Sequence, residues 1–282
     1  MELFITSDLH YGTTDAGDRA VEAIAAHVVA HGADALLIAG DLAIDEAALE
    51  RCLALFAGCA GPKLAVPGNH DVWLPYEDDD GCSFELHERT LPRLFERHGF
   101  HPLHLRPLVL GGVGFVGSMG WYDYSFRDEE LGFPLAAYEA KTFPGDGGPL
   151  WNDARYARMG HTDVELTELL LRRLEAQLAE VRADEVVAML HHVPTKELLF
   201  FPRALVPKRW RFANAFLGSE RLSELIAGDP RVRHTFCGHI HRGRSASKGR
   251  HVFTSVGDSD AGKRLLVRTT PTRPLGARVF AG

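Results

Sequence analysis

Two histidines stand one residue apart near the end of the chain, in the stretch TFCGHIHRGR that begins at Thr235. In an extended segment, residues two apart point to the same side, so His239 and His241 would face one point. Two neutral imidazoles in that arrangement suit a shared cation. An isolated pair of this kind is more often an ordinary surface pair, so its meaning depends on what the rest of the chain supplies.

Further side chains of the same chemistry follow four short apolar segments, at residues 3–6, 35–40, 63–68 and 184–190. In chain order they are Asp8 and His10, then Asp41, then Asn69, His70 and Asp71, and finally His191 and His192. Each group comes just past the carboxyl end of a predicted strand, which is where open α/β sheets build their sites. We therefore expect these groups to meet.

Carboxylate, imidazole and amide oxygen suit borderline-to-hard divalent or trivalent metals, and no thiolate is offered. The candidates outnumber what one tetrahedral zinc with an open position needs. They fit two metals that share a bridging carboxylate. Gly40, Gly68 and Gly238 each precede a candidate ligand and would let the backbone approach the metals closely. D-x-H and G-D alone are weak and G-N-H-D is moderately specific, but five such motifs in this order indicate a metal centre that includes His239 and His241.

The elements that must position this centre can be read from periodicity. The apolar runs at 3–6, 35–40 and 63–68 predict buried strands, and residues 17–32 and 45–58 predict helices between them. Strands that alternate with helices imply parallel pairing through crossover helices.

The later part of the chain is less regular. A helix over residues 84–99 is expected to be interrupted near Pro92, and Gly111-Gly112 predicts a hairpin. Residues 120–160 are rich in aromatic, glycine and acidic residues without a clear period, which is typical of a functional loop or lid. The helix over 162–182 would pack Leu166, Leu169, Leu170 and Leu174 in the core. Further elements are expected as strands at 184–190 and 232–238, a helix at 218–228, and final antiparallel strands at 251–256, 264–270 and 277–281.

Composition limits the class of protein. The chain has 282 residues, 45% hydrophobic and 24% charged, with no repeat or linker, so we expect one domain over 1–282. A net charge of -7 argues against a surface that coats nucleic acid. An acidic substrate stays possible because bound metals reverse the local field. The four cysteines lack a C-x-x-C spacing. The N-terminus lacks the features of a signal peptide, and no apolar stretch approaches the ~20 residues of a membrane span. We expect a cytoplasmic protein without membrane contact.

The ordered set D-x-H, G-D, G-N-H-D, H and G-H-x-H resembles the calcineurin-like metallophosphoesterases, from Asp8 to His241. The resemblance implies an α/β (α+β) fold, a four-layer αββα sandwich of two mixed β-sheets flanked by helices. It also implies two divalent or trivalent metal ions, manganese, iron or zinc. One metal would be held by Asp8, His10 and His241, the other by Asn69, His191 and His239, with Asp41 as the bridge.

Two assignments stay open within this set. His192 is the alternative to His191 as the ligand after the fourth strand. The resemblance makes His70 a catalytic histidine that binds no metal, and Asp71 either helps to orient it or caps the next segment.

The implied chemistry is hydrolysis of a phosphoester. A hydroxide that bridges two metals supplies the nucleophile, and the metals stabilise the developing negative charge. No nucleophile elbow or Walker A loop suggests another mechanism.

Candidate substrate contacts are Trp121 and Tyr122, which either line the pocket or pack the lid onto the body, together with His192 and Arg209. Arg209 belongs to a basic and aromatic arm at about residues 196–216, which either recognises phosphate or bases or is an exposed loop without a partner.

We therefore predict hydrolysis of a small phosphomonoester or phosphodiester. One alternative is a nuclease that uses the same centre on single-stranded nucleic acid, which the acidic charge does not favour. The other is a metal-binding scaffold without turnover. The sequence does not indicate an oligomeric state.

Overall fold

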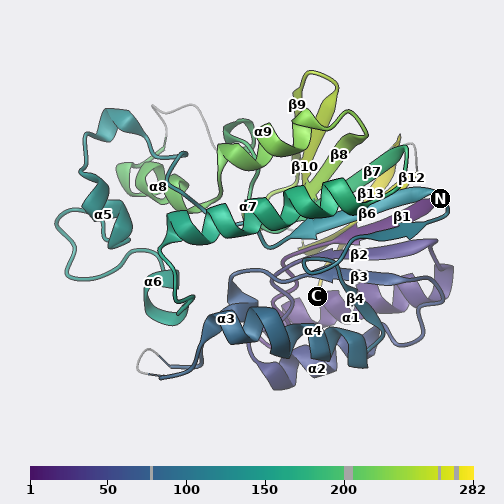
Figure 1. The fold of residues 1–282 in the computed structure, drawn as a ribbon. Helices are drawn as coiled ribbons and strands as arrows, with labels where there is room; N and C mark the ends of the chain where they lie inside the picture. Colours follow the sequence, from purple (N-terminus) through teal and green to yellow (C-terminus); the bar gives the residue numbers. More distant parts are fainter. Residues whose placement is uncertain (77–78, 200–205, 260–261, 270–272) are drawn as a thin grey trace.

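The computed structural model describes residues 1–76, 79–199, 206–259, 262–269 and 273–282. Two mixed β-sheets lie face to face, and helices cover their outer surfaces (Figure 1). This is the predicted four-layer αββα sandwich.

The first sheet contains the N-terminal and C-terminal strands. Its order is β11-β12-β1-β2-β3-β4, with β13 beside β12. β1, β2, β3 and β4 are parallel to one another, and β12 runs antiparallel to β1. The bounds are β1 Glu2–Thr6, β2 Ala35–Ala39, β3 Lys63–Val66, β4 Phe100–Pro102, β11 Asp258–Ser259, β12 Gly262–Thr269 and β13 Arg273–Phe280.

The second sheet is built from the middle of the chain. Its order is β5-β6-β7-β8-β10-β9, parallel from β6 to β10 and antiparallel at both ends. The bounds are β5 Leu108–Leu110, β6 Val113–Ser118, β7 Glu185–Leu190, β8 Val232–Cys237, β9 Arg244–Lys248 and β10 His251–Ser255. β5 and β6 form the hairpin expected at Gly111-Gly112.

Alternation along the strands separates the apolar layers. On β1, Phe4 points outward to α1 (Asp15–His31), whereas Leu3 and Ile5 point inward to the second sheet. α2 (Glu46–Leu55) and α4 (Leu91–Arg97) join α1 on the outer face of the first sheet. α7 (Asp163–Glu180) and α9 (Glu220–Gly228) cover the second sheet. Burial on both faces explains why these strands have continuous apolar sequences.

Some elements differ from the expectations. β10 pairs in parallel with β8 and is antiparallel only to β9. The helix around Pro92 is not broken, because a π-helical turn at Leu86–Thr90 joins α3 (Ser83–Glu85) to α4 and accommodates the missing N–H of proline. On α7, Leu169 is only half-buried, while Leu171 is buried among the residues packed on the second sheet.

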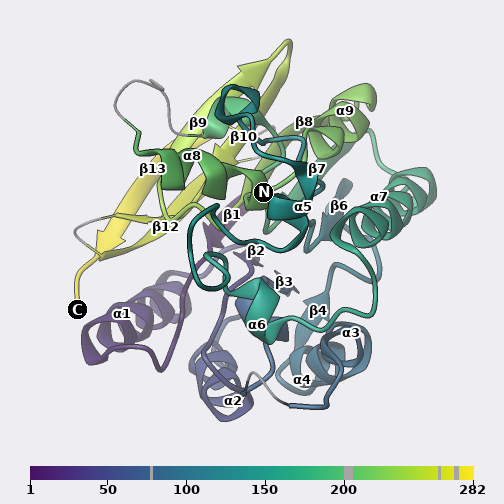
Figure 2. The same ribbon diagram turned by 90° about the vertical axis from the view of Figure 1, so that its left-hand side faces the viewer.

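The residues between β6 and α7, which we call the insertion, lie at one end of the sandwich. It contains α5 (Leu135–Glu139) and α6 (Asp153–Tyr156), and α8 (Lys208–Ala213) of the arm lies beside α5 (Figures 1 and 2). This is the end at which β1 terminates. Among the described helices, none is long and apolar enough to cross a membrane.

Candidate metal centre

The loops after β1, β2, β3, β7 and β8 bring the predicted ligands together. In one group, ligand atoms of Asp8, His10, Asp41 and His241 all lie within 4.8 Å of one another. In a second group, Asp41, His191 and His239 meet the same limit. Asn69 lies beside the second group, with its Oδ1 3.1 Å from His191 Nε2. Asp41 belongs to both groups, as a bridging carboxylate must.

The backbone of this centre is strained at the residues that carry the ligand atoms. Five non-glycine residues there have positive φ in the left-handed region, namely Asp8 (54°), His10 (45°), Asp41 (54°), His239 (73°) and His241 (50°). Such conformations cost about 1–3 kcal/mol each and persist only where the surroundings impose them. The backbone N–H of Asp8 donates to Gly40 O at 3.0 Å and that of His10 to Asp41 O at 2.9 Å, which fixes the two loops against each other.

Two glycines make the close approach of these loops possible. A Cβ on Gly68 would lie 2.1 Å from Asp41 Oδ1, and one on Gly40 would lie 2.5 Å from the His191 ring at Nδ1. Gly40 also has a φ of +83°. Side chains at these positions would push the candidate ligands apart.

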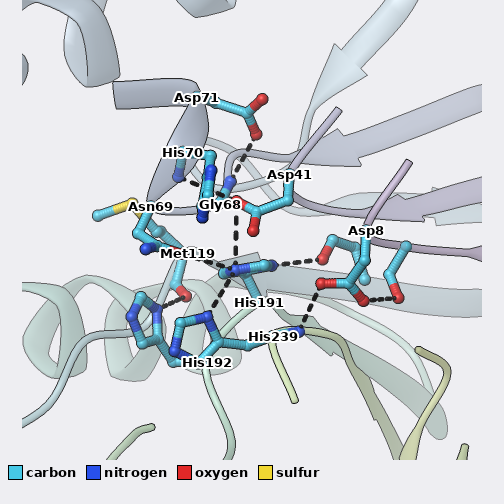
Figure 3. Close-up of polar contacts among 12 residues, drawn as sticks. Asp8, Asp41, Gly68, Asn69, His70, Asp71, Met119, His191, His192 and His239 are labelled. Atoms are coloured by element: carbon cyan, nitrogen blue, oxygen red, sulfur yellow. Dashed lines mark hydrogen bonds and ion pairs between the residues drawn. The ribbon is translucent and has the colours of Figure 1, made fainter. Parts of the chain in front are cut away.

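The hydrogen bonds around the histidines direct nitrogen lone pairs into the centre. His191 Nδ1 lies 2.9 Å from Ala39 O and His239 Nε2 lies 3.3 Å from Phe216 O, and a carbonyl accepts, so both nitrogens donate. The opposite nitrogens, His191 Nε2 and His239 Nδ1, then face each other at 3.1 Å (Figure 3). Two such nitrogens are satisfied together by a cation, so the donor set fits a metal ion.

The same centre contains a buried charge pair. Asp41 Oδ1 lies 3.4 Å from His191 Nε2, and Asp41 Oδ2 lies 3.6 Å from His10 Nε2. Burial opposes ionisation of Asp41, but His191 and His70 hold its pKa well below the usual value. Burial lowers the pKa of His191, but Asp41 outweighs this effect and raises it to about 9. A positive charge therefore lies beside Asp41. It is either the proton on His191 or a metal ion that displaces this proton.

Comparisons with known proteins agree with this centre. The sequence profile of calcineurin-like phosphoesterases matches residues 1–243. The chain belongs to the calcineurin-like phosphoesterase family. The protein is accordingly a metallophosphoesterase, as the motif set predicted. No curated protein sequence matches the chain.

Solved structures of the same fold have distant sequences. The phosphopantetheinyl hydrolase of Mycobacterium tuberculosis superposes with a TM-score of 0.67 at 19% identity, over 90% of this chain and 88% of that one. A dimetal phosphatase from Danio rerio gives 0.58 at 12% identity, over 100% and 98%. GAP50, the anchor in the inner membrane complex of Plasmodium, gives 0.52 at 10% identity, over 100% and 88%. At these identities the likeness shows the fold alone.

In this phosphoesterase, Asp71 acts on the backbone of the centre. Its carboxylate accepts from the N–H of Gly68 at 2.7 Å and of Leu42 at 2.8 Å, which ties the loop after β3 to the loop after β2. Burial raises the pKa of Asp71 to about 7, and Asp41 adds to the effect. Its side chain is directed away from the ring of His191 (Figure 3).

His70 lies at the open side of the centre. Its ring stacks on Trp73 with centroids 3.7 Å apart and meets His10 edge-on at 4.8 Å. Trp73 was not among the predicted site residues, although its position three residues after His70 would have placed it one 3₁₀ turn away.

Three predicted substrate contacts do not line the cavities of the site. His192, Trp121 and Tyr122 are fully buried, and the His192 ring packs against both aromatic rings at 5.0 and 5.8 Å. His192 Nδ1 lies 3.1 Å from Met119 O. These side chains pack the insertion onto the body, which was the alternative interpretation. The structure brings His191 into the ligand groups and leaves His192 outside them.

Arg209 does not line the cavities either. Its guanidinium pairs with Asp146 at 2.5 Å and lies over the ring of Phe143. Arg211 pairs with Asp128 and Glu130. Part of the predicted arm, residues 200–205, lies outside the described residues.

Two cavities share a border beside the centre. One of about 610 Å³ opens over Asp41, Asn69, His239 and His241, with apolar walls at Leu150, Trp151, Leu198, Leu199, Trp210 and Ile240. A second of about 740 Å³ is lined by Ile44, Asp45, Glu46, Leu74, Leu86 and Leu91, among others. Both are bordered by His70, Trp73 and Asn152. His70 therefore borders two spaces that can each hold an organic group.

Proposed function

We propose that the protein hydrolyses a phosphodiester of a small organic molecule at a centre that holds two metal ions. In this proposal, Asp8, His10 and His241 hold one ion, Asn69, His191 and His239 hold the other, and Asp41 is shared. The supporting observation concerns the two groups of carboxylates and histidines. Within each group, the ligand atoms lie within 4.8 Å of one another, and Asp41 belongs to both groups.

When bound, metal ions in such a site lower the pKa of a coordinated water and neutralise charge on the phosphoryl oxygens. The chain itself supplies the surroundings. His70 lies at the border of both cavities and is placed to hold a proton near the departing oxygen. The stacked ring of Trp73 holds the imidazole in place.

The preference for a diester rests on the two cavities. A phosphomonoester carries one organic substituent and needs one of them, whereas a diester carries two. Because both cavities border His70, a phosphorus atom there can place one substituent in each. The apolar walls favour substituents with apolar surface.

A nuclease is less well supported. Two arginines of the arm, Arg209 and Arg211, are paired with carboxylates of the insertion and so are already neutralised.

The free cysteines, Cys52, Cys59, Cys82 and Cys237, favour a reducing compartment such as the cytoplasm.

The test is a comparison of substrates on protein of known metal content. We expect a higher kcat/KM for bis(4-nitrophenyl) phosphate than for 4-nitrophenyl phosphate. Single-stranded DNA and a phosphopantetheinyl ester, suggested by the name of the Mycobacterium tuberculosis structure, complete the panel. Ile44→Trp, which narrows the second cavity, should raise KM for the diester much more than for the monoester.

Two results would contradict the proposal. A kcat/KM for the monoester equal to or above that for the diester, with neither KM changed by Ile44→Trp, would contradict the preference for a diester. No turnover of any substrate with manganese, iron or zinc would favour the scaffold.

A further inference from the structure

Asp153, the first residue of α6 in the insertion, is a buried carboxylate with four hydrogen-bond donors around it. It is 2% exposed. Its Oδ1 accepts from Asn69 Nδ2 at 2.9 Å and from Trp73 Nε1 at 2.7 Å. Its Oδ2 accepts from Trp151 Nε1 at 2.8 Å and from Tyr122 OH at 3.1 Å.

The contact with Asn69 determines which end of that amide faces the metal centre. The two ends of an amide are nearly equal in shape, so packing alone does not select one. An ionised carboxylate only accepts hydrogen bonds, so Asn69 must turn its NH₂ toward Asp153. Its oxygen then points the other way and lies 3.1 Å from His191 Nε2. The reversed amide would place its oxygen against the carboxylate and its NH₂ against the ligand nitrogens.

The same carboxylate fixes two rings of the site. Trp73 stacks on His70 at 3.7 Å, and Trp151 meets His239 edge-on at 5.8 Å. Both indoles border the cavity over the ligand groups. One side chain of the insertion thus contacts a candidate ligand and the walls that surround it.

We infer that Asp153 is a positioning residue of the metal centre. It holds the amide oxygen of Asn69 toward one metal and so sets the affinity of that site, although it binds no metal itself. This inference rests on the proposed function, in which Asn69 is a ligand. Hydrogen bonds that orient metal ligands typically change affinity 10–100-fold when removed.

The chain contains a matched control. Asp163, at the start of α7, is also a mostly buried carboxylate that accepts from an indole, a phenol and an ammonium group. Its donors are Trp121 Nε1 at 2.8 Å, Lys141 Nζ at 2.5 Å and Tyr124 OH. None of these donors is a candidate ligand or borders either cavity. Asp163→Asn therefore weakens a similar network away from Asn69.

The experiment titrates metal-free protein with Mn²⁺ by equilibrium dialysis and measures bound metal at each free concentration. We expect the wild type to bind two equivalents. Asp153→Asn should lower the affinity for one equivalent about 10–100-fold and change the other little. Asp163→Asn should match the wild type in metal binding, even where its thermal midpoint falls as much as that of Asp153→Asn.

Asp153→Glu serves if Asp153→Asn does not fold, because it keeps the charge and acceptors but moves them by one methylene. It should also weaken one equivalent. Either folded variant binding both equivalents like Asp163→Asn would overturn the inference and leave the two-metal proposal intact. A wild type that binds no second equivalent would instead contradict the proposed function.

Discussion

The adjacent histidines after β7 allow a test of the metal centre with two nearly equivalent changes. His191→Ala and His192→Ala each remove a fully buried imidazole from the same loop. His191 contributes Nε2 to the ligand group that contains Asp41 and His239. His192 lies outside that group and touches it through ring contacts, with His239 at 4.4 Å and with His191 at 5.3 Å. The two variants should therefore differ in metal binding and resemble each other in folding.

The expected loss of stability is similar for both. Each ring donates one hydrogen bond to a backbone carbonyl, at Ala39 for His191 and at Met119 for His192. Truncating a large buried side chain costs about 2–5 kcal/mol, and a lost hydrogen bond accounts for about 1 kcal/mol of that. In metal-free protein, His191→Ala also leaves Asp41 without its nearest cationic partner, which places it toward the upper end of this range.

The expected effects on metal are far apart. Loss of a residue that hydrogen-bonds a metal ligand typically lowers metal affinity 10–100-fold. His192 makes no hydrogen bond to a candidate ligand, so His192→Ala should keep the metal affinity within about tenfold of the wild type. His191→Ala should exceed the 100-fold limit for one equivalent. The assay is Mn²⁺ equilibrium dialysis, with urea unfolding of the metal-free variants as the control. If His192→Ala loses an equivalent while His191→Ala keeps both, the ligand assignment is reversed.

Other changes test the remaining roles. Asp41→Asn removes the shared charge and should weaken both equivalents and lower the rate, and unchanged metal content and rate would remove Asp41 from the centre. His70→Ala should keep both metals and lose about 10²–10⁴-fold on alkyl esters but less on nitrophenyl esters, whose leaving groups need less help; an equal loss on both would indicate a positioning role. Burial, with Arg268 nearby, lowers the pKa of His234 to about 4. Because the unfolded state takes up the proton first, the contribution of His234 is constant above about pH 6.5 and should fall by on the order of 2–3 kcal/mol by pH 4.5. Urea unfolding of metal-free His234→Gln should show a weaker acid dependence than the wild type, and equal dependence would contradict this assignment.

The meeting of the candidate ligands was predictable from sequence because of a general property of parallel sheets. β1, β2 and β3 run in the same direction and end at the same edge, and β7 and β8 do so in the facing sheet. Side chains that follow these strands must therefore lie near one another. The order of motifs along the chain was enough to bring Asp8, Asp41 and His239 to one place without knowledge of any contact.

The substrate contacts were not predictable in the same way. Trp121 and Tyr122 follow β6 directly, and their position resembles that of the ligand residues. An aromatic side chain at a strand end, however, either borders a cavity or fills the core, and the choice depends on what the insertion places above it. Here the insertion covers both rings, and Trp210 and Trp151 border the cavity instead.

Asp153 in the insertion and Asp163 just after it give a physical explanation for the composition of this part of the chain. A stretch rich in aromatic and acidic residues without a period indicates no regular element, and its acids would ordinarily be assigned to solvent. Indole N–H and phenol O–H groups are, however, hydrogen-bond donors within apolar rings, so they satisfy a carboxylate without leaving the core. Both aspartates are held in this way, mostly by donors far away in sequence, as Asn69 and Trp73 are from Asp153. The spacing of residues along the chain does not predict such contacts. The combined excess of acidic residues, tryptophan and tyrosine does indicate them. In this part of the chain, that excess indicates carboxylates held within the core, and Asp153 is the one that contacts a candidate ligand.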